Sequence, residues 1–307
     1  GTVLVADITP GSEDSSFSYF TLAHGVLYFV EDGFGVEERL WRSDGTAEGT
    51  RPVFTDPASP LRVRASVAFN GALYLVASSD FGRSYHLWTS DGTREGTTVV
   101  KTFLPGRAPW GLSRMGERLF FTADDGVHGS EPWVSDGTAA GTVMLKDLAP
   151  GSTSSSSWLR SFAAAGSVFY FILEVPFSGM QLWRSDGTSE GTVPLTNYPG
   201  ALVSAPGGPR LKELRGLTLS GGTLFFSADD GMTGHELWKS DGTPAGTVRV
   251  KDINPTGHAY PDYLRDANGV LVFEAWEPGT GRELWKSDGT AEGTVRLTDL
   301  PLGEAGS

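Results

Sequence analysis

Two acidic segments of the sequence could bind a metal ion. The candidate ligands are Asp124, Asp125 and Glu131 in the first segment, and Asp229, Asp230 and Glu236 in the second. Carboxylate oxygens are the hard ligands that Ca²⁺ takes. However, neither segment has the alternating acids of a calcium-binding loop, and aspartates also close turns by accepting backbone hydrogen bonds. We favour turns closed by aspartate and keep Ca²⁺ as the alternative.

A second set of residues combines aromatic and basic side chains. Its members are Trp110, Trp158, Tyr263, Arg210 and Lys212. Aromatic rings beside cations can hold a ligand in a depression on the protein surface. The alternative is that these rings only fill a central channel.

Sequence patterns of known catalytic sites are missing. There is no Gly-x-Ser-x-Gly, no His-Glu-x-x-His and no phosphate-binding loop. The five histidines show no metal-ligand spacing within one element. Because these patterns are missing, we expect no catalysis. Residues from separate repeats can still meet in space, so a divalent-ion-dependent hydrolase or lyase at a central channel is the alternative.

One repeat supplies the elements that must position these residues. A Leu-Trp-x-Ser-Asp-Gly-Thr segment recurs six times at intervals of 45 to 55 residues, with Pro132 once in place of the leucine. Its tryptophans are Trp41, Trp88, Trp133, Trp183, Trp238 and Trp285. Glycine supplies positive φ and aspartate accepts backbone hydrogen bonds, so the segment predicts a turn. Because it recurs in every repeat, we expect a structural role for the turn and packing between repeats for the tryptophans.

Each repeat contains four short strand-like segments, the second of which is apolar at consecutive positions, as in residues 26–30. This pattern is typical of strands covered on both faces. Six such units predict an all-β, six-bladed β-propeller of four-stranded antiparallel blades, forming one domain over residues 1–307. Residues 1–7 and 293–299 compete for the fourth strand of the last blade. The chain could therefore also be cut from a longer array.

The order of strands assigns the loops to two faces. In an up-and-down blade, the loops after the second and fourth strands lie on one face, and the Ser-Asp-Gly-Thr turns lie on the other. The variable loops and the insertion at residues 198–215 therefore share one face. Loops on a rigid scaffold often carry function, so we predict ligand binding on this variable-loop face.

Composition excludes several classes of partner. The 307 residues include 24 basic and 37 acidic side chains, a net charge of −13 that disfavours nucleic acid. No run approaches the roughly 18 apolar residues of a membrane helix, so we expect no membrane insertion. The absence of cysteine excludes disulfide scaffolds and thiolate zinc sites.

The repeated segments resemble the bacterial ELWxxDGT repeat proteins. The likeness rests on residues 236–243 and 283–290, which read Glu-Leu-Trp-Lys-Ser-Asp-Gly-Thr, and on the strand at residues 246–255. Arg39, His86 and Gln181 depart from the family glutamate. The resemblance implies a secreted or surface-attached repeat protein and brings no established activity.

These observations predict a secreted or cell-surface binding module that acts as a monomer. Its ligand would be a glycan, a peptide or a protein, bound through the variable-loop face. A structural segment of a longer adhesive array is a further alternative.

Overall fold

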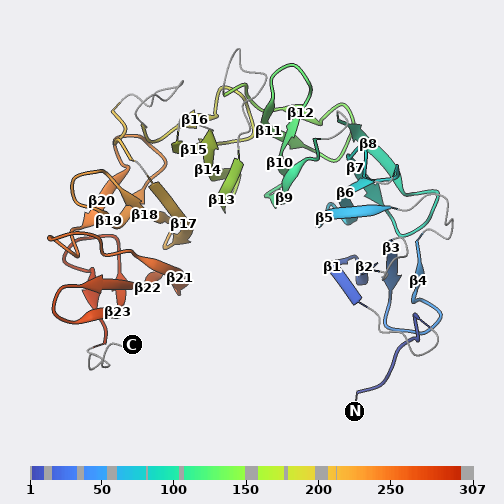
Figure 1. Ribbon diagram of the computed structural model, residues 1–307, viewed down its shortest axis with the longest axis horizontal. Coiled ribbons are helices and arrows are strands. Elements are labelled where there is room, and N and C mark those ends of the chain that lie inside the picture. The colour runs from blue at the N-terminus through green and yellow to red at the C-terminus, as the bar shows by residue number, and fades with distance from the viewer. Residues whose placement is uncertain are drawn as a thin grey trace. The chain divides into compact units, whose positions relative to one another are not determined.

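The computed structural model describes residues 2–9, 16–32, 38–53, 61–80, 82–103, 107–148, 158–175, 179–197, 207–211 and 213–298. Contacts divide the chain into two compact units, Gly1–Ser155 and Ser156–Ser307. Each unit contains three four-stranded sheets, which we number as blades 1 to 6 in chain order (Figure 1).

The first unit holds blades 1 to 3. Blade 1 consists of β1 (Ser16–Ala23), β2 (Val26–Asp32), β3 (Arg39–Ser43) and β4 (Arg51–Pro52). Blade 2 consists of β5 (Arg62–Phe69), β6 (Ala72–Ser78), β7 (His86–Ser90) and β8 (Thr98–Thr102). Blade 3 consists of β9 (Trp110–Met115), β10 (Arg118–Asp124), β11 (Ser130–Ser135) and β12 (Val143–Met144).

The second unit holds blades 4 to 6. Blade 4 consists of β13 (Trp158–Ala165), β14 (Val168–Val175), β15 (Gly179–Ser185) and β16 (Val193–Pro194). Blade 5 consists of β17 (Glu213–Ser220), β18 (Thr223–Asp229), β19 (His235–Ser240) and β20 (Val248–Lys251). Blade 6 consists of β21 (Asp262–Ala267), β22 (Val270–Glu277), β23 (Gly281–Ser287) and β24 (Val295–Arg296).

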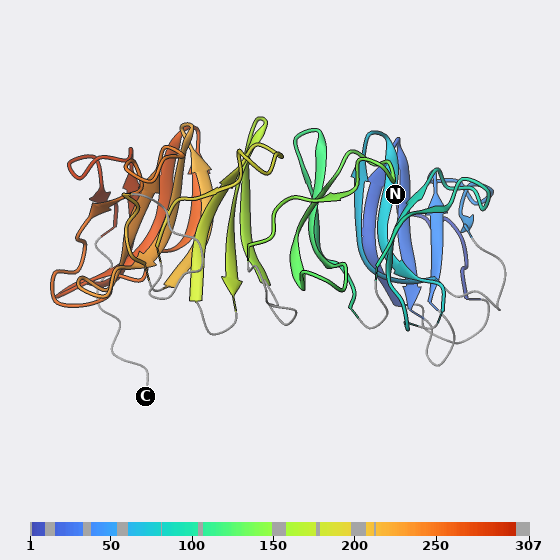
Figure 2. The ribbon, with the colours of Figure 1, turned by 90° about the horizontal axis from the view of Figure 1, so that it is seen from above.

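The strands of every blade pair with their sequence neighbours in antiparallel order. Figure 2 shows the long strands of each blade running beside one another. No helix occurs among the described residues, and hence none that could span a membrane. The fold class predicted from the sequence, an all-β six-bladed propeller of four-stranded antiparallel blades, is confirmed.

The two candidates for the last fourth strand differ in structure. β24, from the C-terminal candidate, pairs with β23 and completes blade 6. Residues 2–7 form no strand, and Val3 and Leu4 are exposed. Of the two candidates, the C-terminal one is therefore a strand, and the described part of the N-terminal one is not. The one-domain assignment stays a prediction.

The Ser-Asp-Gly-Thr turn closes on itself through hydrogen bonds. In blade 5, Asp241 Oδ1 accepts from Thr243 N at 2.8 Å and from Thr243 Oγ1 at 2.7 Å. Thr243 Oγ1 accepts from Gly246 N at 3.0 Å, and the hydroxyls of Ser240 and Thr247 lie 2.8 Å apart. The hydrogen bonds from Thr243 lower the pKa of Asp241. All six turns repeat this network, so the predicted structural role is confirmed.

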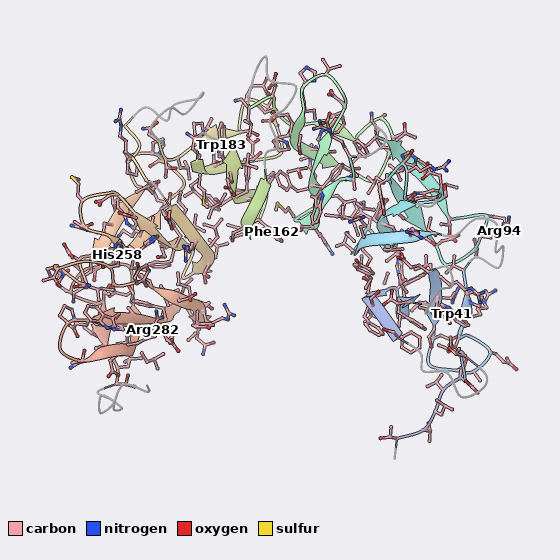
Figure 3. All side chains as sticks on the ribbon, viewed as in Figure 1. Trp41, Arg94, Phe162, Trp183, His258 and Arg282 are labelled. Atoms are coloured by element: carbon pink, nitrogen blue, oxygen red, sulfur yellow. The ribbon has the colours of Figure 1, made fainter. Side chains whose placement is uncertain are left out.

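Apolar side chains fill the space between successive blades of a unit. Trp133 of blade 3 belongs to one buried cluster with Tyr74 of blade 2. Trp238 of blade 5 shares a cluster with Tyr170 of blade 4, and Trp285 shares another with residues of blade 5. The predicted packing of the motif tryptophans between repeats is confirmed for these three. Figure 3 shows the side chains that fill these layers.

A ring on the second strand of one blade lies against the turn glycine of the next. A Cβ atom placed on Gly242 of blade 5 would lie 2.7 Å from Tyr170 Oη of blade 4. The corresponding distance is 2.2 Å from Gly137 to Tyr74 Oη, across blades 2 and 3. These glycines also have positive φ, so the position excludes side chains for two reasons.

The contact at Gly242 gives a testable prediction. We expect Gly242→Ala to lower the free energy of unfolding by about 1–3 kcal/mol, because the methyl group meets Tyr170 in a packed interface. Urea unfolding followed by tryptophan fluorescence measures the loss.

Gly45 of blade 1 provides the matched control. Its φ is +89°, the same as that of Gly242, but nothing lies within 4 Å of its added Cβ. Gly45→Ala should therefore show only the backbone penalty, and Tyr170→Phe should reduce the loss caused by Gly242→Ala. Equal losses at the two glycines would contradict a role for the inter-blade contact.

Candidate functional site

The aspartates of both acidic segments close turns, as the sequence favoured. In blade 3, Asp124 Oδ1 accepts from Gly126 N at 2.7 Å and its Oδ2 lies 2.8 Å from Arg107 Nη1. Asp125 Oδ1 accepts from the backbone N–H groups of Val127 and His128, each at 2.9 Å. These carboxylates therefore already have partners within the protein.

The turn of blade 5 is built in the same way. Asp229 Oδ1 accepts from Gly231 N at 2.6 Å. Asp230 Oδ1 accepts from Met232 N at 2.8 Å and from Thr233 N at 2.9 Å. The second oxygen of Asp229 is not committed to this turn, which leaves that residue as a possible ligand.

The glutamates of the acidic segments face backbone amides. Glu236 is fully buried and accepts from Ile253 N at 2.8 Å and Asn254 N at 3.2 Å. Glu131 is equally buried and accepts from Leu148 N at 2.9 Å. Gln181 makes the same kind of link in blade 4, donating to the carbonyl of Thr196. The side chain at this place in the third strand therefore forms hydrogen bonds with the backbone of the segment that follows the fourth strand.

The two predicted sets of three carboxylates are not brought together as metal sites. Among the described residues, one group of three potential ligands lies close together, formed by Asp229, His235 and His258. The two predicted sets are not such groups, because each aspartate accepts hydrogen bonds from its own turn, whereas each glutamate is buried against backbone amides. The sets are Asp124, Asp125, Glu131 and Asp229, Asp230, Glu236.

The predicted aromatic and basic residues are only partly assembled. Trp110 begins β9 in the first unit and is 63 % exposed, whereas Tyr263 lies on β21 in the second unit and is 64 % exposed. Arg210 is exposed beside Asn197. The side chain of Trp158 and the whole of Lys212 lie outside the described residues. The structure does not show these residues in one shared site.

A pocket in the second unit provides a more complete site. It has a volume of about 380 Å³ and is lined by Asn254, Thr256, His258, Tyr260, Trp276 and Arg282. It lies between the loop joining β20 to β21 and the ends of β22 and β23. These are connections of the two kinds that the sequence assigned to the variable-loop face. Figure 3 labels His258 and Arg282 in this part of the unit.

Buried polar groups hold the pocket loop in place. The side-chain amide of Asn254 donates to the carbonyl of His258 at 2.9 Å, and its oxygen accepts from Thr256 N and Oγ1. The carbonyl of His235 accepts from Ala259 N at 2.9 Å. Together with the bonds from Glu236 to the start of the loop, these contacts make the pocket wall a fixed structure.

Two tyrosines of this loop region adopt a strained backbone conformation. The φ angle is +46° at Tyr260 and +52° at Tyr263. Tyr263 is the first unpaired residue of a β-bulge in β21, and that place is taken in blades 1, 3 and 5 by Tyr19, Gly111 and Gly216, which also have positive φ. A non-glycine residue at positive φ costs of the order of 1–3 kcal/mol, and such strain concentrates at functional sites. The positive φ of Tyr263 therefore belongs to a bulge that recurs among the blades, and only the strain at Tyr260, which lines the pocket, favours a role in binding.

The sequence alone did not identify His235, His258, Tyr260, Trp276 and Arg282. Searching for metal ligands within one element missed the histidines, because His235 begins β19 and His258 lies in the loop before β21. The sequence did assign the loops after the second and fourth strands to one face, and this was the signal that could have predicted that His235 and His258 lie close together.

Comparisons with known proteins support the fold alone. No protein-family model and no curated protein match the sequence. Among solved structures, a prolyl endopeptidase has a TM-score of 0.53 at 11 % identity, over 92 % of this chain and 43 % of that one. Oligopeptidase B from Leishmania major has a TM-score of 0.51 at 11 % identity, over 94 % and 42 %. This chain thus spans less than half the length of either enzyme.

The buried carboxyl of Glu236 gives a prediction about pH. Burial raises its pKa to about 7 although two amides donate to it. Between about pH 4.5 and 7 the folded chain therefore binds more protons than the unfolded chain, and this group's contribution to stability falls as pH rises. We expect Glu236→Gln to reduce that fall, as measured by urea unfolding at pH 5, 6, 7 and 8.

Glu292→Gln is the control, because Glu292 is exposed on the turn before β24. This variant should keep the pH dependence of the parent chain. An unchanged slope in Glu236→Gln would show that Glu236 does not retain a proton in the folded chain.

Proposed function

We propose that this chain is a non-catalytic propeller module that binds a peptide, or a peptide segment of a protein, at the pocket of blades 5 and 6. The observation that carries the proposal is the pairing of two partly exposed rings with a guanidinium group. Tyr260 is 44 % exposed, Trp276 is 38 % exposed, and Arg282 pairs with Trp276 across β22 and β23. Such a wall fits an apolar side chain that lies next to a carboxylate.

Arg282 retains hydrogen-bonding capacity for this carboxylate. Its Nη1 lies 3.8 Å from Glu274 Oε2, which is longer than the roughly 2.7–2.9 Å of a charge-assisted hydrogen bond. The side chain of Arg282 is also 44 % exposed. A ligand carboxylate can therefore reach two N–H groups of Arg282 without first breaking a strong ion pair.

The nature of the structural neighbours favours peptide over glycan. The two solved structures with similar folds are named as a prolyl endopeptidase and an oligopeptidase, enzymes that act on peptides. At 11 % identity this likeness concerns the fold, so peptide binding by this chain stands as our proposal.

We further propose that the chain belongs to the ELWxxDGT repeat proteins and acts outside the cell or on its surface. Six copies of the Leu-Trp-x-Ser-Asp-Gly-Thr segment support the first statement. The second rests on what the resemblance implies. Fractionation of cells that produce the natural gene, with immunodetection of this chain, should find it in the medium or on the cell surface; exclusive recovery from cytoplasm would contradict it.

Selection from a random peptide library tests the binding function. Peptides enriched on the full chain in the presence of EDTA are labelled with fluorescein and measured by fluorescence anisotropy. We expect them to carry an aromatic or aliphatic residue beside Asp, Glu or the C-terminal carboxylate. Trp276→Ala and Arg282→Ala should each weaken binding by about tenfold or more, since each removes a central contact.

Trp110→Ala and Arg94→Ala serve as matched controls, because both residues belong to the first unit. They should leave the affinity unchanged. Loss of binding in Trp110→Ala, with the affinity of Trp276→Ala intact, would transfer the site to the first unit. If no peptide is enriched and the chain binds glycans in a way that depends on Trp276, the proposed ligand is a glycan and not a peptide.

A further inference from the structure

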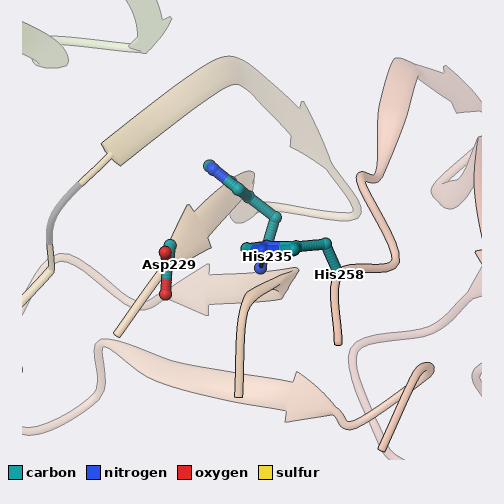
Figure 4. A group of neighbouring side chains, drawn as sticks. All are labelled: Asp229, His235 and His258. Carbon is teal, nitrogen blue, oxygen red and sulfur yellow. Dashed lines mark hydrogen bonds between the residues drawn. The ribbon is translucent and has the colours of Figure 1, made fainter. Parts of the chain in front are cut away.

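Three potential metal ligands from separate segments meet beside the pocket. Asp229 ends β18, His235 begins β19, and His258 lies in the loop before β21 (Figure 4). One ligand atom from each lies within 4.8 Å of those of the other two. A four-coordinate ion with bonds of about 2.1 Å needs ligand atoms roughly 3.4 Å apart. Binding of such an ion therefore requires rotation of Asp229 and His258, the two more exposed side chains of the group.

The ring of His235 carries a buried nitrogen without a partner. His235 is 4 % exposed, and its Nδ1 has no hydrogen bond. Its Nε2 lies 3.2 Å from Glu213 Oε2. If Nε2–H donates to Glu213, the lone pair of the neutral ring is on Nδ1. A histidine that donates one N–H to a carboxylate while its other nitrogen is unprotonated is the usual arrangement of a metal-bound histidine.

We propose that Asp229, His235 and His258 form a binding site for a divalent transition-metal cation of the zinc class. Two imidazole nitrogens and one carboxylate oxygen suit zinc, whereas Ca²⁺ takes six to eight oxygen ligands. Three protein ligands leave one position open for water or for a group of a bound ligand. Glu213 acts as a positioning residue through His235.

His258 can bind the ion if its ring gives up one hydrogen bond. Its Nδ1 accepts from His235 N at 3.0 Å, and a neutral imidazole has one unprotonated nitrogen. Coordination through either ring nitrogen therefore replaces that hydrogen bond by a metal–nitrogen bond. Tyr260 stacks on both rings, with centroids 5.3 Å from His235 and 4.9 Å from His258. This stacking limits how far the imidazoles can move apart.

The site is independent of the proposed peptide binding, although His258 also lines the pocket. Metal binding is measured without peptide, and peptide binding is measured in EDTA. Failure of one proposal therefore leaves the other standing.

Isothermal titration of the full chain, stripped with EDTA and dialysed, tests the site with ZnCl₂ and with CaCl₂. We expect one Zn²⁺ per chain and no Ca²⁺ at this position. His258→Ala and Asp229→Asn should weaken Zn²⁺ binding by tenfold or more, and Glu213→Gln by about 10–100-fold. Zn²⁺ should also raise the melting temperature of the parent chain, and the rise should be lost in His258→Ala.

His128→Ala is the control, because His128 lies in the β10–β11 turn of blade 3, the counterpart of the turn between Asp229 and His235, and pairs with Asp125. It should leave Zn²⁺ binding unchanged. Because His258 is exposed, we expect His258→Ala to fold even if replacement of the buried His235 prevents folding, and a melting curve without Zn²⁺ checks this. Zn²⁺ binding that survives both His258→Ala and Asp229→Asn, or no binding by the parent chain, would overturn the proposal.

Discussion

The contact between a ring of one blade and the turn glycine of the next sets the spacing on which the rest of the structure depends. Tyr74 meets Gly137, Tyr170 meets Gly242, and Phe225 meets Gly289. A side chain at the glycine would push the blades apart and open the apolar layer between them. The Ser-Asp-Gly-Thr turn therefore has two functions, since its own hydrogen bonds fix its shape and its glycine admits the neighbouring ring.

The opposite ends of the strands are fixed by a different device. A buried carboxylate or amide on the third strand binds the backbone just beyond the fourth strand, as Glu236 and Gln181 do. Burial of Glu236 costs desolvation free energy, and the two amide donors offset part of it. The loop after β20 is thereby held firmly enough to bear Tyr260 at positive φ. A rigid scaffold of this kind allows neighbouring loops to vary in sequence without losing position.

Many of the chain's aspartates accept hydrogen bonds that shape its turns. The turn aspartates accept hydrogen bonds from their own repeats, and Asp125 and Asp230 accept them from the loops they begin. Acids that look like a metal site in the sequence are therefore turn formers. Asp229 also closes a turn, but unlike the other acids it has two histidines from other segments near it. Chemistry in this fold thus depends on which loops carry imidazole and aromatic groups, more than on the number of acids.

The sequence by itself determined the blades. Six copies of one segment, apolar second strands and the residue types of the turn predicted the strands, their order and the structural role of the motif, since these depend on interactions within one repeat or between identical neighbours. It also predicted that the variable loops share one face, which stays a prediction for the chain as a whole. Only the tertiary structure brought His235 and His258 together, placed Trp276 beside Arg282, and turned Glu236 toward backbone amides. The contacts of His235 with His258 and of Glu236 with Ile253 join residues 23 and 17 positions apart, and the pairing of Trp276 with Arg282 depends on the register of one hairpin. Local patterns record neither side-chain direction nor register.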